Sequence, residues 1–367
     1  MDSNRIITKL TSLNEDILSG WQLQELINLM SSSYYKLDII NEVLEGIKKN
    51  KSFFIVDKSF DINNNYKKIR NSDRWSFNNK SNVESLYNLG KPIALIPDGK
   101  IQNIYYIFKY YEKIYTLFGK YKIERINKSV LKDLINSENG IDLLKKIVDE
   151  KLNTLKTEKS MKDDIKKRSN RIYSDICKEF SNSSDDFDKV QILAEKLNNN
   201  SSVEEYLKKD EYKVIERKYF QKFYTLLKRL ERPIIFSYDK DNNEIEIVKK
   251  QYICNDSKSE SFFDVKQYSH NSPFEIIFIG GTMMIPMISF AISKMKKEKN
   301  KKSDNELSTP INVEPKNAIT KDESYISSKL NKVDKNIKSK VEKKLNKYGL
   351  INDKIVIDFE TEKKKRQ

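Results

Sequence analysis

The chain has 367 residues, of which 34% are charged and 38% hydrophobic, and 69 Lys and Arg against 54 Asp and Glu give a formal net charge of +15. The length suits two or three domains, and 20 Tyr with 17 Phe can fill a core. The composition therefore excludes a wholly disordered chain, a collagen-like repeat and a polytopic membrane protein.

The positive charge comes almost entirely from lysine, which limits what it says about function. The sequence contains 59 Lys and 10 Arg, together with 35 Asn and only 4 Ala, as expected of AT-rich codons. Arg rather than Lys makes the bidentate contacts that read guanine and hold phosphate. We therefore interpret most of the net charge as a solvated basic surface set by codon usage.

The cysteines and the N-terminus predict the cellular location. Cys177 and Cys254 are 77 residues apart and belong to no CxxC or Cys/His cluster, so disulfide bonds are not implied. The N-terminal residues MDSNR do not begin a secretory signal peptide. We expect a cytoplasmic protein from a bacterium of low GC content.

Residues 1–138 are expected to form an α-rich domain with short strands. Apolar residues spaced three and four apart over 23–47 predict helix, which Ser31–Ser33 could divide into a hairpin. The apolar runs 53–56 and 92–96 predict buried strands, because each is short and bounded by polar or turn residues.

Residues 101–118 form the most aromatic segment of the sequence. Its Ile, Tyr, Phe and Leu residues make two adjacent stripes at helical spacing, which predicts a deeply packed helix. A strand is the alternative, since these residue types also favour sheets. Lysines among the aromatic residues further suggest a base-stacking platform, but we prefer core packing as the interpretation.

Residues 139–232 are expected to be a long-helix region. One apolar face extends from Ile141 to Phe180, and the opposite face is rich in Lys and Asp, as in a coiled coil or the outer helix of a bundle. A further helix is predicted over 210–231, ended by Pro233.

Residues 233–293 begin where the apolar period changes from helical to alternating, which predicts a small β region. Strands are expected on either side of an Asp- and Asn-rich turn at Asp239–Asn243. The spacing of acidic and amide residues in this turn is like that at the start of a calcium-binding loop. However, Glu244 occupies the position that is Gly in such loops, and Lys250 occupies the position that is Glu. We therefore interpret it as a hairpin turn and predict no metal site.

The segment 273–293 is the only long apolar run. It carries no charge over the 17 residues 276–292, the lower limit for crossing a bilayer, and a Lys cluster follows it. It reads as a core strand over 274–279 with a following helix, as a transmembrane helix, or as a segment docked on anionic lipid. The strand and helix is preferred, because a span would require export of a long flank on one side.

Membrane association would place apolar side chains of this run, and the lysines after it, against lipid. The predicted lipid contacts are Ile276, Ile277, Phe278, Ile279, Met284, Ile288, Phe290, Lys294, Lys296 and Lys297.

The tail has two parts. Residues 294–322 have the Lys-, Ser- and Pro-containing composition of a linker. Within 323–367, apolar residues at helical spacing from Ile326 onward predict an amphipathic helix that ends at Gly349, and Ile357 lies in a predicted short strand. The tail is expected to dock on the body of the protein or on a partner.

No catalytic, cofactor-binding or metal-ligating residue is predicted. The one histidine, His270, cannot build a zinc site with two distant Cys, and HExxH, GxSxG and Walker-type motifs are absent. Asp163 and Asp164, being adjacent, point about 100° apart on a helix, which suits solvation better than two-metal catalysis.

The sequence thus predicts an α+β, predominantly helical fold with a small antiparallel sheet and a C-terminal linker plus amphipathic helix. It favours a bacterial interaction protein without a cofactor, which binds a protein partner through helical surfaces and associates with membrane through 273–293. A role in conflict with phages is a base-rate expectation only.

Two other functions stay open. A nucleic-acid-binding protein would use a basic face that contains Lys120, Lys122, Arg125, Lys166, Lys167, Arg168 and Arg171. An enzyme such as a nuclease would need carboxylates gathered from distant positions into one pocket.

Overall fold

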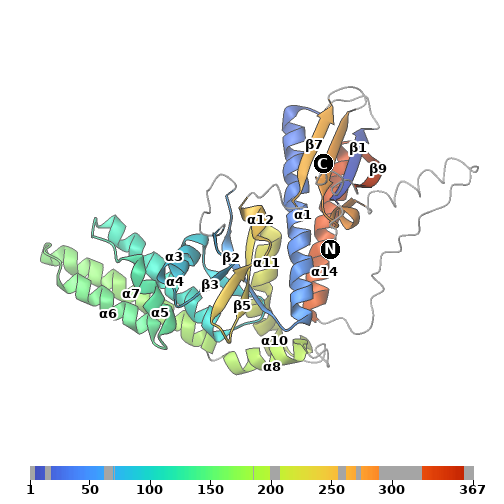
Figure 1. Cartoon of the computed structure of the whole chain (residues 1–367). Helices are drawn as coiled ribbons and strands as arrows, with labels where there is room; N and C mark the ends of the chain where they lie inside the picture. The colour runs from blue at the N-terminus through green and yellow to red at the C-terminus, as the bar shows by residue number, and fades with distance from the viewer. Residues whose placement is uncertain are drawn as a thin grey trace, which may run out of the picture. The chain divides into compact units, whose positions relative to one another are not determined.

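The computed structural model describes residues 5–12, 18–61, 69, 71–184, 186–198, 207–254, 262–269, 274–288 and 325–358. It confirms the α+β, predominantly helical fold and contains two antiparallel sheets (Figure 1).

The chain divides into two compact units. Unit 1 comprises Met1–Leu44, Lys249–Glu323 and Ser327–Gln367, and unit 2 comprises Glu45–Val248 and Ser324–Ile326. The five consecutive domains that the sequence suggested stay a prediction. Pairing between strands far apart in the chain builds unit 1, and local sequence patterns do not show such pairing.

Unit 1 is built on a sheet of four strands in the order β7-β8-β1-β9. Its strands are β1 (Arg5–Ser12), β7 (Asp264–Ser269), β8 (Glu275–Gly280) and β9 (Leu350–Asp358), and its helices are α12 (Lys250–Ile253), most of α1 (Gly20–Lys48) and most of α14 (Tyr325–Lys347). β1 pairs antiparallel with both β8 and β9. The N-terminal strand is therefore central to a sheet completed by the C-terminal part of the chain.

Two features of unit 1 differ from the sequence-based expectation. α1 continues as one helix through Ser31–Ser33, where Ser33 is buried and the Ser32 hydroxyl donates a 3.2 Å hydrogen bond to the Leu29 carbonyl. β1 was not predicted, because its buried face includes Thr8 along with apolar residues, which weakens the alternation of apolar and polar residues.

The apolar run forms a strand and a short helix, as in the preferred interpretation. β8 is followed by a turn and a helical segment at 284–288, and the Gly281 amide donates a 2.7 Å hydrogen bond to the Tyr34 hydroxyl. The side chains of Ile276, Phe278, Met284 and Ile288 are fully buried. Within the ranges given above, no helix has the length and apolar character needed to cross a bilayer.

A charged group lies within the core of unit 1. The Asp38 side chain, only 8% exposed, accepts a 3.1 Å hydrogen bond from Tyr252 and lies 3.2 Å from the Lys249 ammonium. Lys249 also lies 3.3 Å from Glu42. Burial raises the pKa of Asp38, and Lys249 and Tyr252 oppose that shift by stabilising the carboxylate. Asp38 therefore depends on both partners to stay ionised.

Unit 2 contains a second antiparallel sheet in the order β3-β6-β5-β2-β4. The strands are β2 (Ser52–Ser59), β3 (Arg74–Ser76), β4 (Pro92–Ala94), β5 (Pro233–Asp239) and β6 (Glu244–Ile247). The predicted hairpin is confirmed as β5 and β6, and the Asp239 carboxylate accepts hydrogen bonds from the Asp241 and Asn242 amides of its turn. Phe54 of β2 stacks on Phe236 of β5 with ring centroids 5.0 Å apart.

Helices make up the rest of unit 2. They are α3 (Lys80–Leu89), α4 (Gly99–Lys120), η1 (Lys128–Val130), α5 (Leu131–Asn136), α6 (Gly140–Asn153), α7 (Lys159–Ser184), α8 (Phe187–Asn198), α10 (Asp210–Ile215), the π-helical η2 (Glu216–Phe220) and α11 (Gln221–Arg229). The predicted buried helix over 101–118 is confirmed as α4. The expected long helix over 140–180 is instead two helices, which pack against each other.

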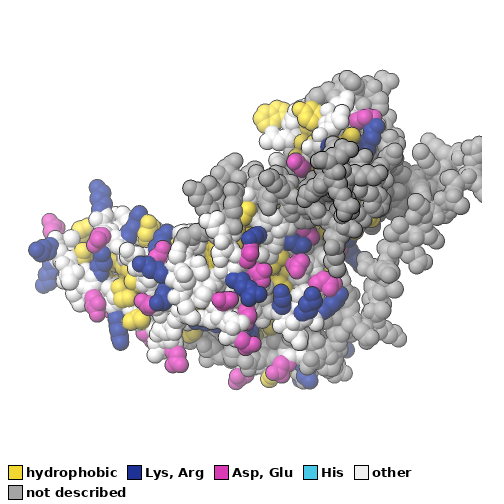
Figure 2. Space-filling model, viewed as in Figure 1, with side chains coloured by type: hydrophobic (Ala, Val, Ile, Leu, Met, Phe, Trp, Pro, Cys, Tyr) yellow, Lys and Arg dark blue, Asp and Glu magenta, His cyan; other side chains and the backbone are white. Residues whose placement is uncertain are grey.

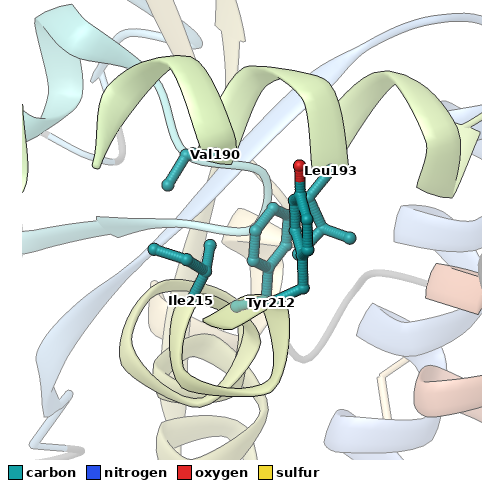
Figure 3. Packing of buried hydrophobic residues seen from close by; sticks show 5 residues of the cluster. Val190, Leu193, Tyr212 and Ile215 are labelled. Atoms are coloured by element: carbon teal, nitrogen blue, oxygen red, sulfur yellow. The ribbon is translucent and has the colours of Figure 1, made fainter. Parts of the chain in front are cut away.

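A small hydrophobic cluster joins α8 to the segment after it. Val190 and Leu193 of α8 face Tyr212 and Ile215 of α10 (Figure 3), and Phe220 of η2 belongs to the same cluster. Side chains packed against its edge include Tyr219 and Tyr325. Tyr325, in the first turn of α14, therefore belongs to unit 2.

Gly140 allows α6 to start where it does. A Cβ at this position would lie 2.2 Å from the Leu134 carbonyl oxygen and 2.6 Å from Ile107 Cδ1. We expect Gly140→Ala to destabilise unit 2 by about 1–3 kcal/mol through this overlap, measured by denaturant unfolding. Gly20→Ala is the control, because among the described residues no atom beyond those of the adjoining helix backbone and chain neighbours lies within 4 Å of a Cβ there. Equal stability of both variants would contradict the packing described for α6.

Removing the Lys249 ammonium is expected to leave Asp38 buried without its countercharge. Lys249→Met should destabilise the protein by about 3 kcal/mol at neutral pH, and adding Asp38→Asn should restore part of the loss. Without Lys249, the folded-state pKa of Asp38 lies far above its unfolded value of ~3.9. The loss of folding free energy is therefore complete at neutral pH, where the buried carboxylate is ionised. It becomes smaller as the pH falls toward ~3.9 and Asp38 takes up a proton. The stability gap to the wild type should narrow between about pH 7 and pH 5. A constant gap would contradict this account.

Candidate nucleic-acid interface

The candidate site depends on the packing of α4 against α7. Asp98 caps α4 by accepting a 3.1 Å hydrogen bond from the Ile101 amide, and the apolar stripes of α4 are buried. The Tyr121 hydroxyl after the end of α4 donates a 2.5 Å hydrogen bond to Asp164 near the start of α7. The Tyr106 hydroxyl near the start of α4 donates a 3.2 Å hydrogen bond to the Glu179 carbonyl near the end of α7. The two helices are therefore antiparallel.

This packing brings together residues that the sequence predicted as a nucleic-acid face. The Asp164 carboxylate receives the hydroxyl of Tyr121 and, at 3.0 and 3.1 Å, the Nε of Arg168. These hydrogen bonds, with the charges of Arg168 and Lys120, lower the pKa of Asp164. Lys120 and Arg168 thus both act on the same carboxylate. We call the seven residues Lys120, Lys122, Arg125, Lys166, Lys167, Arg168 and Arg171 the basic tip.

Arg125 is held in place by an aromatic ring. Its guanidinium lies 4.1 Å from the centroid of the Tyr115 ring, and its Nη1 donates a 2.9 Å hydrogen bond to the Tyr115 hydroxyl. A Cβ at Gly119 would lie 3.0 Å from Nη2 of the same arginine, so the glycine leaves room for it. Arg125 is nevertheless exposed, and its orientation is set before any ligand binds.

Five cations of the basic tip have no polar partner among the described residues. The side chains of Lys120, Lys122, Lys166, Lys167 and Arg171 are exposed, and within the described part of the chain none makes a hydrogen bond or an ion pair. On α7, Lys167 and Arg171 are one turn apart and so lie on the same side of the helix. These cations can therefore bind an anionic partner without losing a hydrogen bond or an ion pair to another described residue.

The basic tip lies in a region of concentrated positive charge. Residues 119–125 and 145–171 hold thirteen Lys and Arg against six Asp and Glu, and three of the chain's ten Arg. In Figure 2, Lys and Arg side chains, with some Asp and Glu among them, are exposed at the end of unit 2 where Figure 1 shows α6 and α7. AT-rich codons explain lysine but act against arginine, so the three arginines are not explained by codon usage.

Sequence reasoning missed the side chains that support the basic tip. Tyr115 and Tyr121 read as parts of an aromatic helix, and Asp164 as a solvated carboxylate. Glu124, in the loop after α4, forms a 2.7 Å ion pair with Lys151 of α6. No spacing in the sequence indicates these contacts, because each joins two elements that are brought together only by the fold.

A small pocket beside α4 is a weaker candidate for function. It has a volume of about 120 Å³ and is lined by Lys58, Tyr87, Asn88, Gly90, Lys91 and Glu112. The Lys91 ammonium lies 3.0 Å from Asp57 and 2.8 Å from Glu112, so its charge is already neutralised. We interpret Lys91, Asp57 and Glu112 as an ion-pair group that links β2, the start of β4 and α4, rather than as a ligand site.

The residues predicted to contact lipid are only partly described. Ile277 and Ile279 are half-buried in β8, and the other four described ones are in the core of unit 1, as noted above. Phe290, Lys294, Lys296, Lys297 and the linker 294–322 lie outside the described residues, as does His270. Lipid contact stays a prediction.

The comparisons with known proteins identify no relative. The chain matches no protein-family model, no curated protein and no solved structure. In the described ranges, no group of three or more His, Cys, Asp or Glu is placed to hold a metal ion.

Proposed function

We propose that this protein binds double-stranded nucleic acid through the basic tip, by contacts to backbone phosphates. The observation that supports this most is the set of five exposed cations, from the end of α4 and from α7, that make no internal ion pair among the described residues. Phosphate contacts of this kind supply affinity and position but carry no direct sequence information.

The chemistry of the tip favours phosphate contact over base stacking. Proteins that bind single strands offer exposed aromatic rings to the bases. Here the ring of Tyr115 is covered by Arg125, and the hydroxyl of Tyr121 is bonded to Asp164. Both tyrosines therefore support cations instead of receiving bases, and the expected binding is independent of sequence.

The dependence of duplex binding on salt concentration tests the proposal quantitatively. If about five phosphates are neutralised, log K should fall with log salt at a slope of about −4.5 on duplex DNA. Raising the salt from about 50 to 200 mM should then weaken binding by roughly two to three orders of magnitude. Binding that is insensitive to salt would exclude this mode.

Removing two cations of α7 that make no ion pair with a described residue should weaken duplex binding and reduce its salt dependence. For Lys167→Ala with Arg171→Ala, the slope of log K against log salt should decrease in magnitude by about 2, measured by fluorescence anisotropy on a short DNA duplex. The matched control is Lys49→Ala with Lys51→Ala, two exposed lysines of unit 2 at the turn between α1 and β2. Equal effects of the two double variants would contradict a localised site.

Removing the carboxylate of the tip should act in the opposite direction. Asp164→Asn takes away a negative charge beside Lys120 and releases Arg168 from its ion pair. We expect tighter duplex binding and a steeper salt slope, by about one unit, in the same anisotropy measurement. Weaker binding, with the variant folded as judged by circular dichroism, would show that the tip is not the contact surface.

A further inference from the structure

The exposed side of α14 presents a row of lysines. The exposed residues of this helix are Lys332, Lys335, Lys340, Lys343 and Lys347, together with the uncharged Ser328, Asn336 and Asn346. At about 3.6 residues per turn, the five lysines lie within an arc of roughly 140° and extend roughly 22 Å along the helix. We call these five residues the lysine stripe.

No carboxylate balances the lysine stripe on the exposed side of α14. Of the acidic residues in this helix, Asp334 lies 2.7 Å from the Lys338 ammonium and Glu342 is buried. In the described ranges, none of the five lysines makes a hydrogen bond or an ion pair. The whole chain has 54 acidic against 69 basic residues, so codon usage alone would mix carboxylates among these lysines. The uniform charge of the stripe is complementary to an anionic surface.

A tryptophan is exposed on the neighbouring helix α1. Trp21 is 84% exposed, the highest value among the large hydrophobic residues of the described ranges. Its backbone is held in the first turn of α1 by a capping box, in which the Ser19 amide donates a 2.8 Å hydrogen bond to the Gln22 side chain. The Gln22 amide in turn donates a 3.3 Å hydrogen bond to the Ser19 hydroxyl. Core packing therefore does not explain a tryptophan at this position.

Trp21 lies beside one end of the lysine stripe. Glu25, one turn after Trp21 on the same side of α1, accepts a 2.7 Å hydrogen bond from the Tyr348 hydroxyl and forms an ion pair with Lys344. The hydrogen bonds of Lys344 and Tyr348 lower the pKa of Glu25, and the charge of Lys347 contributes to this shift. Within unit 1, the start of α1 thus lies next to the end of α14 (Figure 1).

We propose that the lysine stripe and Trp21 form a surface that docks on a lipid bilayer containing anionic lipid. A row of lysines on an amphipathic helix is attracted to the negative potential of such a bilayer. Tryptophan favours the boundary between lipid headgroups and hydrocarbon, because its ring is apolar and its indole nitrogen can donate a hydrogen bond. An exposed indole has no comparable use on the phosphate backbone of a duplex, so this surface fits lipid better than nucleic acid.

Vesicles of defined composition test the docking surface. In co-sedimentation with the full chain, vesicles of phosphatidylcholine with phosphatidylserine should bind the protein, whereas vesicles of phosphatidylcholine alone should bind it far more weakly. Lys340→Gln with Lys343→Gln should weaken binding to the anionic vesicles by roughly tenfold. The matched control is Lys49→Gln with Lys51→Gln, two exposed lysines of unit 2. Equal binding of the wild type to both kinds of vesicle, no binding, or equal effects of the two double variants would overturn the proposal.

Tryptophan fluorescence tests the contact of Trp21 with lipid. The chain has two tryptophans, and the other one, Trp75, is buried. Emission should therefore move to shorter wavelength when the wild type binds anionic vesicles, and Trp21→Phe should abolish this shift. An unchanged emission of the bound wild type, or a shift that persists in Trp21→Phe, would contradict the placement of Trp21 against lipid.

Duplex binding by the same variants separates this surface from the basic tip. Lys340→Gln with Lys343→Gln should leave the affinity for duplex DNA and its salt slope unchanged. A lower affinity for duplex DNA with unchanged binding to vesicles would assign the stripe to nucleic acid and overturn the proposal. The two proposals fail separately, because the variants of the basic tip leave the lysine stripe and Trp21 in place.

Discussion

The antiparallel packing of α4 against α7 fixes the position of every candidate contact in unit 2. Tyr121 and Asp164 hold one end of this helix pair, and Tyr106 and the Glu179 carbonyl hold the other. Buried apolar side chains of α4 fill the space between these ends. Lys120 and Arg168 of the basic tip lie at the first end, so a change in the register of the two helices would separate them.

The structure separates lysines that serve the fold from lysines that do not. Lys249 balances a buried carboxylate in unit 1, and Lys91 joins two carboxylates beside β4. By contrast, the cations of the basic tip are exposed and make no ion pair in the described ranges, apart from Arg168. Surface ion pairs contribute little to stability, so leaving these charges unpaired costs the fold little and keeps them accessible to a ligand.

The sequence predicted elements whose evidence is local. The buried helix over 101–118 and the hairpin around Asp239 followed from apolar spacing and turn chemistry, and both are confirmed. The break between α6 and α7 was missed, because the apolar face continues across it. β1 was missed because a strand with polar residues on its buried face has no clear alternation.

The candidate site could be predicted only in part. Counting charges along the chain picked out the seven residues of the basic tip, but not the hydrogen bonds of Tyr121 and Arg168 to Asp164 that bring them together. The scarcity of arginine weakens the net charge as a signal of nucleic-acid binding, but three of the ten arginines lie in the basic tip.

The most direct test of the account is a lysine-reactivity footprint of the full chain, read by mass spectrometry with and without duplex DNA. Acylation of an exposed lysine is slower when a phosphate group is bound to its ammonium group. We predict protection of Lys120, Lys122, Lys166 and Lys167, with Lys49 and Lys51 unchanged. Protection confined to lysines outside the basic tip, such as those of the 294–302 segment, would contradict the proposal that α4 and α7 form the nucleic-acid interface.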